Sequence, residues 1–198
     1  MNKKIIIIGL IIAFPIALIF FFEFGTEGRY DIPLFYEEGV RADTLVSNTC
    51  IERKAEQYLV SNSNLPANKH RIVHLERFDG PVLKTRLEEL ERVQDAHSME
   101  DNVVLLTYVN GASLKASDVS DYDKRIIFLE DFWSIAELDS ATWTQLKQCD
   151  LVMSKQDSRV VLIDSKDRIR GYYNIMDREE TDRLISEIGI LLTNKELQ

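Results

Sequence analysis

The sequence predicts an α/β domain, a central mixed sheet with helices on both faces, preceded by one apolar N-terminal helix. Strand-like and helix-like patterns alternate along the chain after residue 40. An uncharged run of 18 residues, Ile5 to Phe22, comes before them. The length of 198 residues allows one ordinary domain and an anchor, but not two sizeable domains.

The apolar run is long enough to cross a membrane once, since a helix of that length spans about 27 Å. Two lysines precede the run and two glutamates follow it closely. This asymmetry predicts a cytoplasmic stretch at 1–4, a transmembrane anchor at 5–22 in the inner membrane, and all later residues in the periplasm or extracytoplasmic space. A cleaved signal peptide is the alternative, but the run is longer than a usual signal core and no small-residue cleavage site follows it.

A short stalk and a soluble domain are expected after the anchor. Residues 23–40 contain glycines and a proline and are predicted to be extended, and residues 41–198 form the domain. The first clear strand is HRIVHLERF at 70–78. A helix then follows from Pro81 to about His97, because Leu83, Leu87 and Leu90 recur on one face.

The middle of the domain continues this alternation. The nearly continuous apolar run at 102–110 predicts a strand covered on both faces. Residues 125–129 are a short strand candidate, and the stretch from Trp133 to Leu146 is predicted to be helical.

The C-terminal third predicts a hairpin and a helix. Strands at 158–164 and 168–174 flank a turn, and Asp177 with Glu180 forms a capping pair. The helix that follows has an apolar face made by Leu184, Ile185, Ile188, Leu191 and Leu192. The order β-α-β followed by β-β-α is that of a thioredoxin-type fold.

Three stretches carry a family likeness. They are VVLIDSKDRIRGYYNIMDREETDRLISEIGILL at 160–192, LEELERVQDAHSMEDNVVLLTYV at 87–109 and YDIPLFY at 30–36. Together with the anchor they resemble Sco-type proteins, membrane-anchored thioredoxin-fold factors that deliver copper to, or reduce, the copper site of cytochrome oxidase. The resemblance specifies fold better than activity.

The copper ligands of that family have no counterpart in this sequence. The two cysteines of its C-x-x-x-C pair fall on Asp79 and Leu83, and its histidine ligand falls on Gln156 or Asp157. Cu(I) prefers thiolate, thioether or imidazole ligands, which these residues do not offer. The resemblance therefore implies a relative with no catalytic residue, no metal and no cofactor.

Cys50 and Cys149 are the only cysteines, and both follow the anchor. In an oxidising compartment they are expected to form a structural disulfide. Two unpaired thiols or a relocated redox pair remain alternatives, although a catalytic pair normally lies close together in sequence.

Other residues that could bind a metal are interpreted as structural. His70 and His74 lie four apart, but in a strand that spacing separates them by about 13 Å, so we expect two ordinary solvent or edge histidines. His97, at a helix end, is expected to be a dipole partner. The acidic groups at 118–123 and 128–132 lack the spacing of a calcium loop and are expected to be solvated. Trp133 and Trp143 are attributed to packing.

Composition narrows the function further. The net charge of −9 disfavours nucleic acid, and no hydrolase, nucleotide-binding or dehydrogenase motif occurs. The expected function is that of a non-catalytic assembly factor or accessory subunit of a respiratory, cytochrome oxidase type membrane complex, held in the bilayer by residues 5–22. The alternative is a thiol-disulfide oxidoreductase or copper carrier that uses Cys50 and Cys149.

Overall fold

The computed structural model divides the chain into two compact units, Met1–Asp31 and Ile32–Gln198. The residues that it describes are 13–15, 32–38, 40, 57–62, 65–76, 80–112, 115, 117, 119, 128–153 and 159–194. In the first unit, residues 13–15 are helical and exposed, and the rest of the predicted anchor lies outside the described residues. Within the described ranges, no helix combines the length and apolar character that a membrane span requires.

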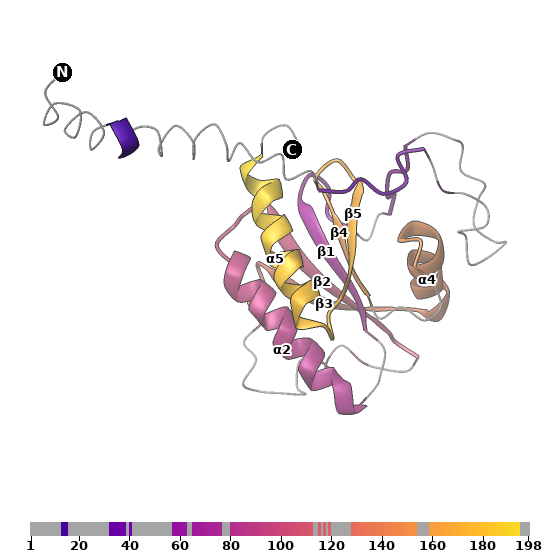
Figure 1. Cartoon of the computed structure of the whole chain (residues 1–198). Helices are drawn as coiled ribbons and strands as arrows, with labels where there is room; N and C mark the ends of the chain where they lie inside the picture. The colour runs from indigo at the N-terminus through magenta and orange to yellow at the C-terminus, as the bar shows by residue number, and fades with distance from the viewer. Residues whose placement is uncertain are drawn as a thin grey trace, which may run out of the picture. The chain divides into compact units, whose positions relative to one another are not determined.

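A five-stranded mixed sheet forms the centre of the second unit, as predicted (Figure 1). Its strands are β1 (His70–Glu76), β2 (Val103–Asn110), β3 (Trp133–Leu138), β4 (Arg159–Ile163) and β5 (Ile169–Asn174). Their order is β3-β2-β1-β4-β5, with β1, β2 and β3 parallel and β4 antiparallel to both of its neighbours. The predicted strand at 102–110 and the C-terminal hairpin are confirmed.

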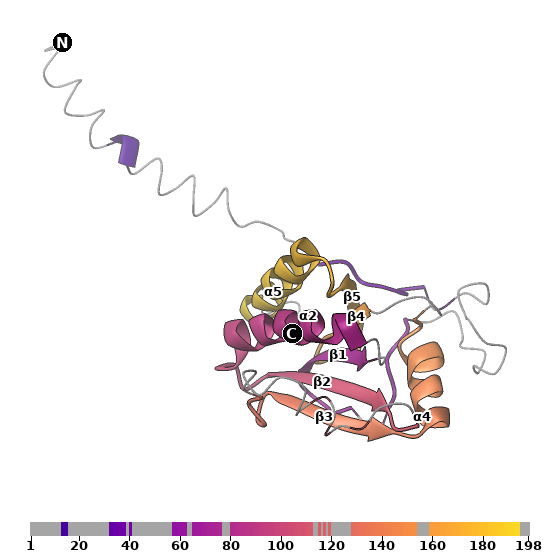
Figure 2. The same ribbon diagram turned by 90° about the horizontal axis from the view of Figure 1, so that it is seen from below.

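Helices cover both faces of the sheet (Figures 1 and 2). On one face lie α2 (Gly80–His97) and α5 (Arg178–Thr193), and on the other α4 (Ser140–Gln145), which continues into a π-helical turn, η1 (Leu146–Asp150). The two long helices were predicted and are confirmed. Asp177 caps α5 by accepting a hydrogen bond from the Glu179 amide at 3.0 Å, whereas Glu180 binds Arg183 instead of completing the capping pair.

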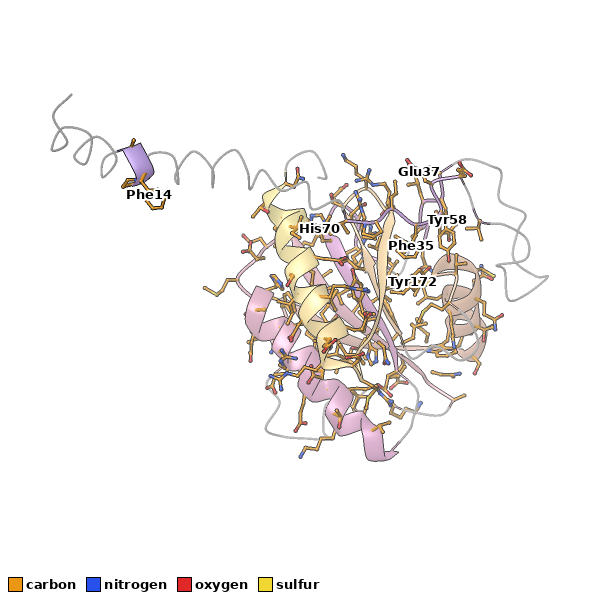
Figure 3. All side chains as sticks on the ribbon, viewed as in Figure 1. Phe14, Phe35, Glu37, Tyr58, His70 and Tyr172 are labelled. Carbon is orange, nitrogen blue, oxygen red and sulfur yellow. The ribbon has the colours of Figure 1, made fainter. Side chains whose placement is uncertain are left out.

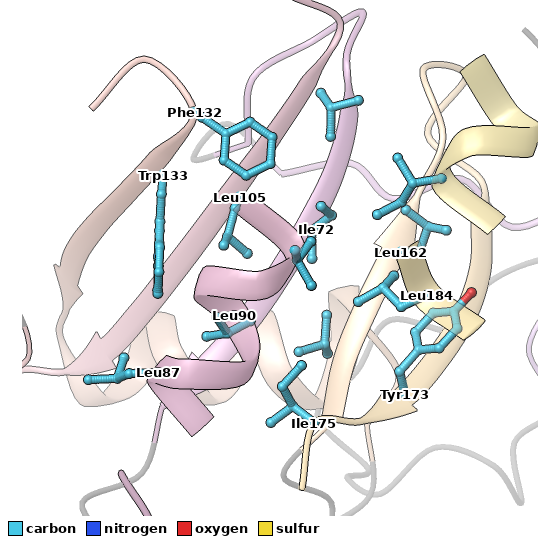
Figure 4. Packing of buried hydrophobic residues seen from close by; sticks show 14 of the residues in the cluster. Ile72, Leu87, Leu90, Leu105, Phe132, Trp133, Leu162, Tyr173, Ile175 and Leu184 are labelled. Carbon is cyan, nitrogen blue, oxygen red and sulfur yellow. The ribbon is translucent and has the colours of Figure 1, made fainter. Parts of the chain in front are cut away.

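Two hydrophobic clusters fill the space between the layers. The first lies under α2 and α5, where Leu87, Leu90 and Leu184 contact sheet residues such as Ile72 and Leu105 (Figure 4). The second lies under α4 and η1. Trp133 belongs to the first cluster and Trp143 to the second, which confirms their packing role. Each fully buried leucine contributes about 1.5–3 kcal/mol relative to an exposed one.

The predicted helix from Trp133 to Leu146 is wrong in its first half. Residues 133–138 form β3, whose backbone pairs with β2 from Leu105 to Asn110. The helix begins only after Asp139, whose side chain is its N-cap and accepts hydrogen bonds from the amides of Ala141 and Thr142. The strand predicted at 125–129 is also wrong where it is described, because Phe128 and Leu129 are irregular, and its first three residues lie outside the described ranges.

The segment Ile32–Glu38 packs against β5 and against the stretch at 57–62 (Figure 3). The Phe35 amide donates to the Ile169 carbonyl at 3.0 Å, and the Tyr58 amide donates to the Tyr36 carbonyl at 3.0 Å. Ile32 and Val40 are buried in the first and second clusters respectively. Part of the predicted stalk range therefore contributes to the core of the domain.

Candidate functional site

The carboxyl end of β1 and the start of α2 form the candidate site, since ligands of α/β sheets bind at the carboxyl ends of strands. The strand ends at Glu76 and the helix begins at Gly80. Asp79, predicted to replace the first cysteine of the Sco pair, lies outside the described residues. So do Gln156 and Asp157, the predicted counterparts of the histidine ligand.

Leu83, the predicted counterpart of the second cysteine, is part of the core. Its side chain is fully buried in the cluster under α2, beside Leu87 and Leu90. The amphipathic spacing of the helix accounts for this position, because residues four apart lie on one face. At this place the chain presents methyl groups to the sheet, and these cannot bind a metal.

A buried ion pair occupies the space next to Leu83. Arg86 Nε and Nη2 donate to the two carboxylate oxygens of Glu76 at 3.0 and 2.5 Å. Glu76 is 1% exposed and Arg86 2% exposed. Such a two-pronged contact matches the geometry of a guanidinium to that of a carboxylate, and it fixes the second turn of α2 to the end of β1.

A chain of polar side chains extends from this pair across the sheet. His74 Nε2 lies 3.4 Å from Glu76 Oε2, and His74 Nδ1 lies 3.4 Å from Thr107 Oγ1. Thr107 Oγ1 accepts a hydrogen bond from Trp133 Nε1 at 3.0 Å. Burial, followed by the nearby Arg86 charge, lowers the pKa of His74 to about 3. The imidazole is therefore neutral at pH 7 and cannot act there as a general acid.

The prediction of solvent or edge histidines at His70 and His74 is wrong. They are 2% and 0% exposed, because β1 is the central strand and both of its faces are covered. Burial costs less for a neutral imidazole than for a charged one, although one ring nitrogen of each histidine, His70 Nδ1 and His74 Nε2, has no hydrogen-bond partner among the described residues. His97 does end α2 as predicted, and its Nε2 lies 2.9 Å from the Ile185 carbonyl of α5.

Sequence reasoning missed Glu76, Arg86 and Thr107. A signal for Arg86 was present, because it lies three positions after Leu83 and four before Leu90, within the apolar stripe of the helix. A charged residue at such a position requires a buried partner. The identity of that partner depends on the packing of α2 against β1, which the sequence pattern does not specify.

Cys149 lies in η1, is 3% exposed and is disulfide-bonded. Cys50 lies outside the described residues, so their pairing stays a prediction. The Tyr58 hydroxyl lies 3.0 Å from the Cys149 carbonyl and 2.6 Å from the Asp150 carbonyl. The Tyr58 side chain, about 90 residues away in the sequence, thus contacts two carbonyls at the end of η1.

The remaining metal candidates do not converge. Glu130 and Asp131 are exposed, as predicted, and the acidic group at 118–123 lies outside the described residues apart from the buried Val119. In the part of the chain that the structure describes, no three histidine, cysteine, aspartate or glutamate side chains are grouped to hold a metal ion.

Comparison with known proteins bears on the fold. No family model matches the chain, and no curated protein does. Among solved structures, a SCO1/SenC family lipoprotein from Bacillus anthracis superposes with a TM-score of 0.50 at 11% identity, over 63% of this chain and 82% of that one. The chain has a Sco-type thioredoxin fold.

Two further structures have lower scores. A putative protein disulfide isomerase from Bacteroides thetaiotaomicron gives a TM-score of 0.49 at 16% identity, over 66% of this chain and 77% of that one. BsSco, a member of the Sco family of cytochrome c oxidase assembly proteins, gives 0.47 at 11% identity, over 65% and 83%. Both scores lie below 0.5, so these two likenesses add no argument, and activity is argued from the site.

Proposed function

We propose that this protein is a membrane-anchored, periplasm-facing domain of Sco type that binds a respiratory, cytochrome oxidase type membrane complex without performing copper or redox chemistry. It acts as an assembly factor or an accessory subunit. The observation that carries the proposal is Leu83, a fully buried core residue at the place where the resemblance requires a cysteine ligand. The Glu76–Arg86 pair beside it adds support, because it fills the start of the helix with groups that already bind one another.

The partner class follows from the resemblance and from the predicted anchor. BsSco is described as a member of a family of cytochrome c oxidase assembly proteins. An anchor at 5–22 would hold the domain near the bilayer and raise its effective concentration toward membrane-embedded partners. A surface that binds a partner can persist after the chemistry is lost, because the two depend on different residues.

Copper binding separates this proposal from a copper carrier. The full-length chain in detergent, reduced and titrated with Cu(I) in the presence of a competing chelator, is expected to bind no stoichiometric copper. The triple variant Asp79→Cys, Leu83→Cys and Gln156→His restores the ligand types of the family and serves as the comparison. One tightly bound copper ion per wild-type chain would contradict the proposal that the protein performs no copper chemistry.

The partner is tested by purification from native membranes in mild detergent. The tagged full-length chain is expected to recover subunits of a respiratory complex. A matched control fuses residues 1–40 to an unrelated soluble domain and identifies proteins recovered through the anchor alone. If the wild-type chain and the control recover the same proteins, the proposed role of the domain fails.

A further inference from the structure

A second polar cluster lies at the other end of β1, away from the candidate site. His70 and Arg71 begin the strand, and Asp164 and Arg170 belong to the β4–β5 hairpin. All four are at most 3% exposed. Arg71 pairs with Ile163 across the β1–β4 ladder, so Asp164 follows directly beside His70 on the same face of the sheet.

A β-bulge directs Arg170 into this cluster. Leu162 pairs with Gly171 and Ile163 with Ile169, so Arg170 is the additional residue of β5. Bulges reorient a side chain and are frequent beside functional sites. Here Arg170 Nε donates to Asp164 Oδ2 at 2.7 Å, and Arg170 Nη1 lies 3.4 Å from the Ile32 carbonyl.

The carboxylate of Asp164 has no acceptor capacity left for further donors. Its Oδ1 accepts from the amides of Lys166 and Arg168 at 2.9 and 3.0 Å. Its Oδ2 accepts from Nε of both Arg168 and Arg170, each at 2.7 Å. A carboxylate offers about four acceptor positions, and all four are used.

Two buried nitrogen atoms on this face have no hydrogen-bond partner among the described residues, His70 Nδ1 and Arg170 Nη2. Arg170 Nη2 is always a donor, and His70 Nδ1 is one in the tautomer that carries its proton there. On the opposite side of the same cluster, Arg71 Nε also has no such partner, although its Nη2 binds the Asp164 carbonyl at 2.7 Å and the Asp167 carboxylate at 2.6 Å. An unsatisfied buried donor costs about 1–3 kcal/mol, and more when it is charged. Native structures explain such groups by a bound ion or water.

We propose that His70 and Arg170 form a binding site for an oxyanion of the phosphate type. Such a group offers several acceptor oxygens at once, which Asp164 no longer can, and a guanidinium binds it with matched geometry. Burial, partly offset by Asp164, lowers the pKa of His70. A neutral imidazole adds no second charge that would need compensation, and in the tautomer with the proton on Nδ1 it donates to the bound oxyanion.

Two sources supply this chemistry, dissolved phosphate and the headgroups of the bilayer that the predicted anchor would enter. The site is independent of the proposed partner role, because it lies at the opposite end of the sheet from Leu83 and Glu76. Failure of the partner role leaves the site intact, and only its headgroup source rests on the anchor of the proposed function.

The first experiment uses the full-length chain in detergent with inorganic phosphate, against chloride at equal ionic strength. The thermal midpoint is expected to rise with phosphate concentration, as binding to the folded state requires. His70→Leu removes one donor and no charge, and is expected to weaken phosphate affinity about tenfold. Arg170→Gln is expected to abolish the response. The matched control is Arg183→Gln, which removes a guanidinium whose side chain is 47% exposed. This variant is expected to retain the rise of the thermal midpoint with phosphate.

The second experiment places the chain in nanodiscs of phosphatidylglycerol or of a phosphate-free glycolipid. The site is assigned to a headgroup if the thermal midpoint is higher in phosphatidylglycerol than in the glycolipid, if His70→Leu reduces that difference, and if free phosphate has no effect. A response to free phosphate alone assigns it to the dissolved anion. If neither phosphate nor phosphatidylglycerol shifts the wild type relative to its control condition, water satisfies these donors and the proposal is overturned.

Discussion

His74, Glu76 and Arg86 are ionisable residues that the core holds by different means. Glu76 and Arg86 neutralise each other through two hydrogen bonds. His74 stays neutral, since burial lowers its pKa to about 3. Replacing a buried pair by apolar residues is often harmless, but removing one partner leaves a buried charge. The two cases lead to separate predictions.

The variant Arg86→Met is expected to destabilise the fold by about 3–5 kcal/mol, because the Glu76 carboxylate loses two hydrogen bonds and its buried countercharge. Urea unfolding of the full-length chain in detergent measures the change. The double variant Glu76→Gln/Arg86→Met should recover part of the loss, since the charge is then absent. Lys84→Met is the control, because Lys84 and Glu88 form an exposed pair with side chains 45% and 49% accessible. Equal stability of Arg86→Met and Lys84→Met would contradict the assignment.

Because His74 is buried in its neutral form, the folded protein is expected to lose stability in mild acid. Its pKa falls from 6.5 when exposed to about 3 when folded, so between these values the unfolded chain binds a proton that the folded chain does not. The contribution is complete above pH 6.5 and is lost as the pH falls toward 3, with a slope of at most about 1.4 kcal/mol per pH unit. His74→Gln should flatten the measured slope between pH 6 and pH 4. A variant with the wild-type slope would show that His74 is not responsible.

These residues also show the limits of prediction from the sequence. The stretch HRIVHLE indicates a strand, and β1 is one, but the strand pattern alone does not say whether His70 and His74 lie at an edge or in the centre of the sheet. The central position of β1 depends on its pairing with β2 on one side and β4 on the other. Because β4 lies about 85 residues further along the chain, the local sequence of β1 does not reveal this pairing. The Leu83 stripe was predictable because it depends only on helical spacing.

At the scale of elements, β3 and β5 show how local signals compete. The stretch from Trp133 to Leu146 contains both a strand and a helix, and the boundary is Asp139, an N-cap residue that the periodicity alone did not reveal. In β5, by contrast, the strand prediction holds although Gly171 interrupts it. The glycine is accommodated because the Tyr173 ring lies over it.

Gly171→Ala is expected to cost about 1–3 kcal/mol through overpacking. The added methyl group would overlap the Tyr173 ring, whose Oη and Cζ lie closest to it. That ring cannot shift freely, because it is fully buried and its hydroxyl binds Glu187 at 2.5 Å. Thermal unfolding measures the effect.

Gly189→Ala is the matched control in α5, where a methyl group would meet nothing within 4 Å. It should stabilise the protein by about 0.5–1 kcal/mol, since alanine is the better helix former. The same sign of change in both variants would refute the packing argument for Gly171.

At the scale of the whole molecule, η1 joins parts of the chain that are far apart in sequence. The Tyr58 hydroxyl meets the Cys149 and Asp150 carbonyls, and the Tyr172 hydroxyl donates to the Leu151 carbonyl at 2.7 Å (Figure 3). The next residue, Val152, has a φ of 50°, a costly conformation for a β-branched side chain. Such a conformation persists only where the surrounding contacts hold it.

The disulfide of Cys149 is expected to be one of those constraints, with Cys50 as its partner. The two positions are 99 apart in the sequence, and a loop of that length contributes about 4–5 kcal/mol in the chain-entropy model. The intact, non-reduced chain should weigh about 2 Da less than the reduced one. Reductant should lower the thermal midpoint of the wild type and leave the double variant Cys50→Ser/Cys149→Ser unchanged. Two free thiols in the denatured, non-reduced chain would remove the covalent constraint and leave the tyrosine contacts to hold Val152 by themselves.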